Sequence, residues 1–144
     1  MNSLNKTFLP SLDCETRNWF VIDCQGQNLG RLATSVVKLL KGKIKPHYYP
    51  SNDVGDYIIL INANLIKINK TTKHYIVKNP GRPGSSLKIR SVTDIIPKLT
   101  IERTIRGMLS VSERKNLMKR VRVYNDDKHP HLTQSPTKLD FIGL

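Results

Sequence analysis

The stretch from Trp19 to Thr34, WFVIDCQGQNLGRLAT, decides the fold class. Its first six residues are mainly apolar and predict a short buried strand over Trp19–Cys24, and GQNLG predicts a tight turn after it. Leu29–Gly42 then has helical periodicity and ends at a suitable C-cap glycine. Its apolar side chains share one face, and Arg31 and Lys38 lie on the opposite side. Strand, turn and helix in this order form the first half of a βαβ unit, which indicates an α/β domain.

Further strands are predicted downstream of this unit. Asp56–Ala63 (DYIILINA) is nearly all apolar, as is typical of a strand in a parallel sheet that helices cover on both faces. Leu65–Asn79 alternates apolar and polar residues and predicts a hairpin or two short strands, with a turn near Asn69–Thr72. Arg120–Tyr124 (RVRVY) predicts a last strand.

Short helices are predicted before this last strand. The Ser91–Asp94 spacing is that of a capping pair and predicts a short helix, which Pro97 interrupts. Helical spacing then continues over Ile101–Leu109. The Ser110–Glu113 spacing predicts another short helix, through Arg120.

The chain shows no internal repeat and no second composition regime, which predicts a single domain. We expect an extended N-terminal arm over residues 1–18, one α/β domain over 19–124 and an extended C-terminal tail over 125–144. Within the domain, Pro80–Ser86 predicts a flexible loop.

Net charge is the most informative bulk property of the chain. Lys and Arg number 24 against 11 Asp and Glu, which gives a formal net charge of +13. Because self-repulsion opposes folding, a polyanionic partner is indicated, with nucleic acid as the first candidate and an anionic membrane as the second. No apolar run approaches the roughly 20 residues that span a bilayer, and no lipidation motif is present, so no membrane partner is expected. Homo-oligomerisation is not expected either.

Basic residues are concentrated in three stretches that contain few acids. The stretches run from Asp23 to Asp53, from Asp56 to Asp94 and from Arg103 to Arg122. One such stretch is usually a solvated face, but three together favour nucleic-acid binding. The candidate RNA-binding residues are Arg31, Lys38, Lys41, Lys43, Lys45, His47, Tyr48, Arg82, Arg106, Arg114, Lys115, Lys119, Arg120 and Arg122.

The basic loop after the first predicted helix also contains aromatic residues. Tyr48 or Tyr49 could stack on an unpaired base, or could pack the loop onto the domain. We expect Lys41, Lys43 and Lys45 to be exposed charges, so that replacing them with Ala weakens RNA binding and leaves the fold near that of wild type.

Candidate enzyme sites each have a simpler interpretation. The Gly26–Gly30 turn is neither a dinucleotide fingerprint nor a P-loop, although an RNA phosphate could use the same helix end. Cys24 favours a buried structural thiol over a nucleophile, and with Cys14 it forms neither a disulfide framework nor a zinc pattern. The two histidines of His129–His131 alone make no metal site. We therefore expect no catalytic residue, metal or cofactor; the alternative is an RNA-modifying or nucleotide-dependent enzyme on an α/β domain.

Several blocks of the chain resemble one known family. The most specific are Trp19–Thr34 and Tyr48–Ala63, which reads Y-x-P-x-x-D-V-G-D-Y-I-I-L-I-N-A, with a K-G-K-x-K loop between them. R-G-M-L (Arg106–Leu109), V-x-V-Y (Val121–Tyr124) and H-P-H-x-x-Q-x-P (His129–Pro136) follow in the same order. From about Trp19 to Asp140, the chain resembles the large-subunit ribosomal protein L-thirteen family.

The resemblance implies a three-layer α/β fold with a mainly parallel four-stranded sheet. It also implies binding to large-subunit ribosomal RNA, neighbouring large-subunit proteins as partners, an early role in subunit assembly and no catalytic site. The basic positions that match the family's motif are Arg31, Lys41, Lys43, Lys45, Arg106, Arg120 and Arg122. Ser110–Lys115 and Pro80–Ser86 depart from the family's pattern, so we expect both segments to follow a local path of their own.

Composition also indicates the compartment. The chain is rich in Ile, Asn and Lys, as an AT-rich genome tends to give. Its first residues lack a signal-peptide apolar region and an Arg-rich transit stretch, which indicates synthesis in the compartment where the protein works. A plastid ribosome is the expected location, with a bacterial cytoplasm as the alternative.

Overall fold

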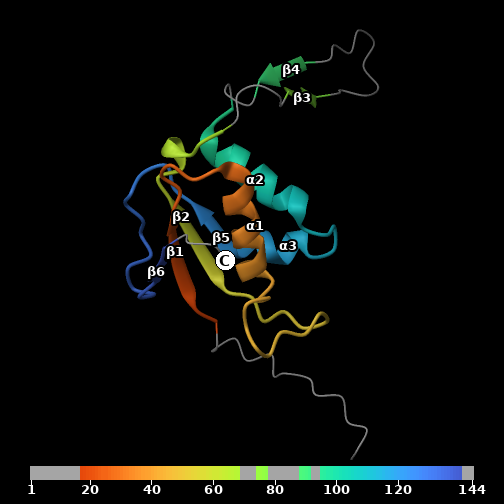
Figure 1. Cartoon of the computed structure of the whole chain (residues 1–144), viewed down its shortest axis with the longest axis vertical. Coiled ribbons are helices and arrows are strands. Elements are labelled where there is room, and N and C mark those ends of the chain that lie inside the picture. Colours follow the sequence, from red (N-terminus) through yellow and green to blue (C-terminus); the bar gives the residue numbers. More distant parts are fainter. Residues whose placement is uncertain (1–16, 69–73, 78–87, 92–94, 141–144) are drawn as a thin grey trace, which may run out of the picture.

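The main sheet of the molecule has four strands, all parallel. The computed structural model describes residues 17–68, 74–77, 88–91 and 95–140 (Figure 1). The strand order is β5-β2-β1-β6, and the strands are β1 Trp19–Asp23, β2 Tyr57–Ile61, β5 Val121–Val123 and β6 Thr137–Leu139. The predicted α/β class and its four-stranded parallel sheet are confirmed.

The helices lie on one face of this sheet (Figure 1). They are α1 Leu29–Leu40, α2 Pro97–Met108 and α3 Arg114–Leu117, with short 3-10 helices η2 Ala63–Leu65 and η4 Met118–Arg120. α1 and α2 pack against each other, and the buried residues of both belong to one core cluster with residues of the strands. On α1, Arg31 and Lys38 are exposed while Leu32 and Val36 are fully buried, so the predicted two-sided helix is confirmed.

The opposite face of the sheet is covered by the segment between β5 and β6. Side chains alternate along a strand, so Val21 and Ile59 point away from the helices and form a second buried cluster. Trp19 and Tyr124 pack on this cluster. His131 contacts both rings, with centroid distances of 5.5 and 5.9 Å. The apolar strands therefore have both faces covered, but among the described residues an extended segment, and not a helix as expected, covers the second face.

The crossover connections of the main sheet share one handedness. The connections from β1 to β2 and from β2 to β5 run outward over the helix-covered face. The connection from β5 to β6 returns in the opposite direction over the other face. Reversing both direction and face preserves the hand, so the three connections have the same hand.

A glycine ends α1 and turns the chain into the basic loop. Gly42 has a φ of 70° and its N–H donates to Leu39 O at 2.9 Å, while Lys43 N–H donates to Lys38 O at 3.0 Å. These two bonds form a Schellman motif, which confirms the predicted glycine cap. A Cβ at Gly42 would lie 2.8 Å from Val54 Cγ2, so the loop's return also requires the bare backbone here.

The predictions for residues 65–97 were partly wrong. Of the hairpin or two short strands predicted within Leu65–Asn79, one short strand is present as β3 His74–Val77. It pairs antiparallel with β4 Lys88–Ser91, which lies outside that range. Ser91 ends β4, residues 92–94 of the short helix predicted after it lie outside the described residues, and Pro97 is the first residue of α2 instead of an interruption. The predicted turn at 69–72 and the loop at 80–86 lie outside the described residues.

The remaining elements agree with the sequence more closely. The short helix predicted after Ser110 is present as α3 followed by η4, and the Ser110 hydroxyl donates to Glu113 Oε2 at 2.7 Å. The last predicted strand is β5. β6 lies inside the segment expected to be an extended tail; it is extended, and it pairs in parallel with β1.

Candidate nucleic-acid interface

The basic loop between α1 and β2 is held against the domain by one of its own lysines. Lys45 Nζ lies 2.6 Å from Asp56 Oδ1 and donates to Val54 O at 3.0 Å. The side chains of Lys45 and Asp56 are only 15% and 4% exposed. Asp56 Oδ1 also accepts the backbone N–H of Asn18 at 2.9 Å. The expectation that Lys45 is an exposed charge is therefore wrong, because its ammonium group compensates a buried carboxylate.

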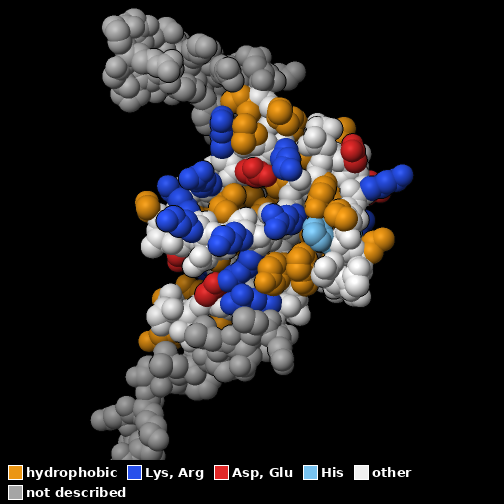
Figure 2. Space-filling view, turned by 180° about the vertical axis from the view of Figure 1, so that it is seen from behind, with side chains coloured by type: hydrophobic (Ala, Val, Ile, Leu, Met, Phe, Trp, Pro, Cys, Tyr) orange, Lys and Arg blue, Asp and Glu red, His pale blue; other side chains and the backbone are white. Residues whose placement is uncertain are grey.

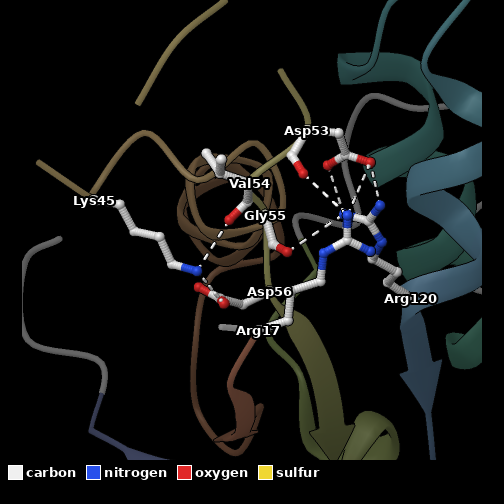
Figure 3. A network of polar contacts seen from close by, with 7 residues as sticks. All are labelled: Arg17, Lys45, Asp53, Val54, Gly55, Asp56 and Arg120. Atoms are coloured by element: carbon white, nitrogen blue, oxygen red, sulfur yellow. Dashed lines mark hydrogen bonds and ion pairs between the residues drawn. The ribbon is translucent and has the colours of Figure 1, made fainter. Parts of the chain in front are cut away.

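Arg120 also points inward, onto the same loop (Figure 3). Its guanidinium binds both carboxylate oxygens of Asp53, with Nη1 2.6 Å from Oδ1, and Nη1 also donates to Gly55 O at 3.4 Å. Arg17 donates to the backbone carbonyl of Asp53 at 3.0 Å. Burial raises the pKa of Asp53, but hydrogen bonding and the positive charges of Arg120 and Arg17 outweigh it, so the net pKa is lowered. Arg120, which is 8% exposed, has a structural partner within the protein.

A second ion pair joins the end of α1 to the segment before α3. Lys41 Nζ lies 2.8 Å from Glu113 Oε2. The hydrogen bond from Lys41 and that from Ser110 lower the pKa of Glu113, so the carboxylate stays charged in its salt bridge. Lys41 is half-buried, so part of its charge remains accessible.

These two pairs, Lys41–Glu113 and Asp53–Arg120, bring two basic segments that are distant in sequence side by side. We call the result the loop–helix surface, made of the accessible basic and aromatic side chains of residues 43–48 and 114–119. Lys43, His47, Lys115 and Lys119 are exposed on it. Tyr48 and Arg114 are half-buried, and Arg114 Nε donates to Leu109 O at 3.0 Å.

A groove of about 330 Å³ runs between the two segments. Residues between Tyr48 and Asp53 form one wall, and residues between Ser112 and Leu117 form the other. Tyr48 belongs to the lining and Tyr49 does not, which separates the two tyrosines that the sequence left equivalent.

The other candidate residues are not among those of the loop–helix surface. Arg31 and Lys38 are exposed on α1, and Arg106 is exposed near the end of α2. Arg122 is exposed on β5. Arg82 lies outside the described residues.

The sheet face opposite the helices carries a second set of cations. In the strand register, Arg122, Ile59, Val21 and Lys138 form one row across the sheet. Register partners of parallel strands point to the same face, so Arg122 and Lys138 flank the buried Val21–Ile59 pair about 14 Å apart, three strand spacings. Seen from behind, the molecule bears many Lys and Arg side chains and few acids, beside apolar side chains and a histidine (Figure 2). Lys138 was not among the predicted RNA-binding residues, because only the pairing of β6 with β1 assigns it to this face.

The residues considered for chemistry have structural surroundings. Cys24 is fully buried, and burial, with a smaller effect of the Asp23 charge, raises the pKa of its thiol to about 12. His131 Nε2 lies 2.8 Å from the hydroxyl of Tyr124, within the ring cluster that covers the sheet. In the described part of the chain, no group of three or more His, Cys, Asp or Glu could hold a metal ion. No helix in that part is long and apolar enough to cross a membrane.

Comparison with known proteins identifies the family. The model of the family described as "Ribosomal protein L13" matches residues 17–130. The chain belongs to the ribosomal protein L13 family.

Similar proteins support this membership along nearly the whole chain. A "Large ribosomal subunit protein uL13c" of Trieres chinensis is 44% identical over 138 residues, which cover 95% of this chain and 98% of that protein. A "Large ribosomal subunit protein uL13" of Prochlorococcus marinus (strain MIT 9303) is 37% identical over 142 residues, with 94% of each chain covered. One of Synechococcus sp. (strain RCC307) is 39% identical over 139 residues, with 92% of each covered.

Membership in the L13 family settles several expectations. The chain is a structural constituent of the large ribosomal subunit, and no finding supports the enzyme alternative. The similarity to a uL13c protein and to cyanobacterial uL13 proteins agrees with a plastid ribosome as its location. The family is a structural, non-enzymatic one.

Proposed function

We propose that this L13-family chain binds large-subunit ribosomal RNA through the loop–helix surface and catalyses no reaction. The observation that carries the proposal is the pairing of Asp53 with Arg120 and of Lys41 with Glu113. These pairs fix two basic segments against each other and leave Lys43, Lys115 and Lys119 accessible. A fixed array of cations suits a folded polyanion, because its spacing selects phosphates at matching positions.

The basic residues divide into two roles in this proposal. Lys45 and Arg120 compensate carboxylates and hold the loop in place. The exposed residues contact phosphates, and Arg31, Lys38, Arg106 and Arg122 extend the contact beyond the loop–helix surface. Charged side chains at such contacts release counterions from the RNA, which supplies a large share of the affinity.

A salt titration tests this proposal. Binding of the full chain to folded large-subunit ribosomal RNA would be measured at increasing salt concentration. If the protein neutralises about six to ten phosphates, affinity should fall by roughly three to five decades between low and moderate salt. A nearly flat dependence on salt would contradict electrostatic binding.

We further propose contacts with neighbouring large-subunit proteins and an early role in subunit assembly. The support for both is membership in the L13 family together with the high positive charge, since early-binding proteins meet exposed RNA. Pulse-labelled protein should appear first in the smallest precursor particles, and its appearance only in complete subunits would exclude the early role. An extended arm over residues 1–18 and an extended course of residues 125–144, whose β6 pairs with β1, remain part of this proposal.

A further inference from the structure

The groove between the two basic segments has room for one small group. Its volume of about 330 Å³ is at the low end for small-molecule sites. It is therefore too small for a nucleic-acid duplex, but a single base can enter it. Because both walls belong to segments that the two ion pairs hold in place, the groove is already formed without a ligand.

The lining of the groove combines apolar surface with amide and hydroxyl groups. Tyr48 contributes an aromatic ring, and Leu117, which is buried, contributes apolar surface. Asn52 and Asn116 contribute side-chain amides, and Ser112 contributes a hydroxyl. A base has flat apolar faces and a polar edge, and unpaired RNA bases are recognised by stacking on aromatic rings and by hydrogen bonds to that edge.

Two carboxylates in the lining indicate which part of a nucleotide enters. Asp53 is paired with Arg120, and Glu113 is paired with Lys41, so the charge of each is compensated. Each carboxylate keeps further lone pairs that accept hydrogen bonds. A phosphate group offers only acceptors to them, whereas the amino group of a base donates. Lys41 also lines the groove, and its ammonium group is paired with Glu113.

We infer that the groove receives one unpaired base of the ribosomal RNA, stacked on Tyr48 with its amino edge toward Asp53, Glu113 and Asn116. The inference rests on the proposed function, because the RNA must be bound for a base to reach the groove. The flanking phosphates meet Lys43, which precedes the first wall in the same loop, and Lys115, which lies within the span of the second wall. Adenine and cytosine, which carry an amino group, bind better than uracil, which has none.

Short single-stranded oligoadenylate, oligocytidylate and oligouridylate are the probes for the test, with the full chain as the protein. Tyr48→Ala should weaken binding to oligoadenylate by about 5- to 150-fold, the effect of losing one base–aromatic stack. The slope of affinity against salt should stay unchanged, because no phosphate contact is lost. Tyr48→Phe, which keeps the ring, should bind within about twofold of wild type.

Tyr49→Ala is the matched control, since Tyr49 is the adjacent half-buried tyrosine and does not line the groove. A second variant, Asn116→Ala, alters an exposed residue and should reduce the preference for oligoadenylate over oligouridylate. Equal affinities of Tyr48→Ala and Tyr49→Ala for oligoadenylate would overturn the inference. If those variants still bound folded ribosomal RNA with a steep salt slope, the proposed function would hold and only the inference about the groove would fail. If the wild-type protein showed no salt-dependent binding to that RNA, both the proposed function and the inference would be overturned.

Discussion

Two lysines of the same loop, Lys43 and Lys45, have opposite roles despite being two residues apart. Lys43 is exposed, whereas the ammonium group of Lys45 lies between Asp56 Oδ1 and Val54 O. Asp56 also holds the backbone of Asn18, immediately before β1. Lys45 is therefore part of the attachment of the loop to the sheet.

Lys45→Ala should consequently destabilise the protein while Lys43→Ala should not. Removing Lys45 leaves the buried carboxylate of Asp56 without its cation, at a cost of about 2–3 kcal/mol. Lys43→Ala should change the free energy of unfolding by less than about 0.5 kcal/mol. Urea unfolding of both variants measures this, and equal stabilities would show that the Lys45–Asp56 pair contributes nothing.

Asp53 should make stability depend on acid pH. A carboxyl whose pKa is lowered in the folded state stabilises the fold at pH values above its ordinary pKa of 3.8. This stabilisation is lost as the pH falls through the folded-state pKa. Asp53→Asn should therefore be less stable than wild type at neutral pH, and the difference should shrink below pH 3.8. Unfolding by urea at a series of pH values tests this, with Asp127→Asn, at an exposed carboxyl, as control. A difference that grows on acidification would have the wrong sign.

At the scale of elements, Gly42 ends α1 and turns the chain into the basic loop. Gly42→Ala should lower the free energy of unfolding by at least about 1–2 kcal/mol, the cost of a left-handed conformation for a residue with a Cβ. The clash with Val54 Cγ2 adds to this cost. Thermal unfolding measures it.

Gly30→Ala in the first turn of the same helix is the matched control. Nothing lies within 4 Å of a Cβ at Gly30, and Ala is the better helix former, so this variant should be as stable as wild type or more stable. Equal losses of unfolding free energy in Gly42→Ala and Gly30→Ala would contradict the assigned role of the left-handed conformation at Gly42 in stability.

At the scale of elements, the sequence predicted what local patterns determine. The apolar residues have the pattern of a buried strand in Trp19–Cys24 and the spacing of a helix in Leu29–Gly42. Both elements are present, as β1 and α1. β6 has only three residues, Thr137–Leu139, and its place depends on pairing with β1, at the other end of the chain. Ser91 had the spacing of a helix start, but pairing with β3 determines its conformation instead.

For the whole molecule, the exposed cations should govern the salt dependence of RNA binding. The triple variant Lys43→Ala, Lys115→Ala, Lys119→Ala should reduce the slope of log affinity against log salt by about 2–3, since each lost phosphate contact removes roughly 0.7–0.9. Its control is the charge-matched variant Lys67→Ala, Lys98→Ala, Lys128→Ala, at exposed positions outside the loop–helix surface. Equal slopes for the two variants would contradict the assigned surface.

The sequence predicted which stretches of the chain are basic, but it did not predict which of their side chains form one exposed surface. A count of charges cannot tell which cation has a carboxylate within reach, so Lys45 and Arg120 were grouped with the exposed residues. Asp53 and Asp56, two acids in an otherwise basic loop, were the available signal that some of its cations are paired internally. Joining 43–48 to 114–119 needed the tertiary structure.

The position of β6 also has a consequence for how the chain folds as it is synthesised. β1 is made early, but its second neighbour in the sheet and the segment that covers Val21 and Ile59 are made late. At about 5–20 residues per second, roughly 6–23 s separate the two strands. During that time β1 has an open edge and an uncovered apolar face, which is a site for mispairing with other chains. A nascent chain of this protein therefore passes through an interval of aggregation risk that the finished fold no longer shows.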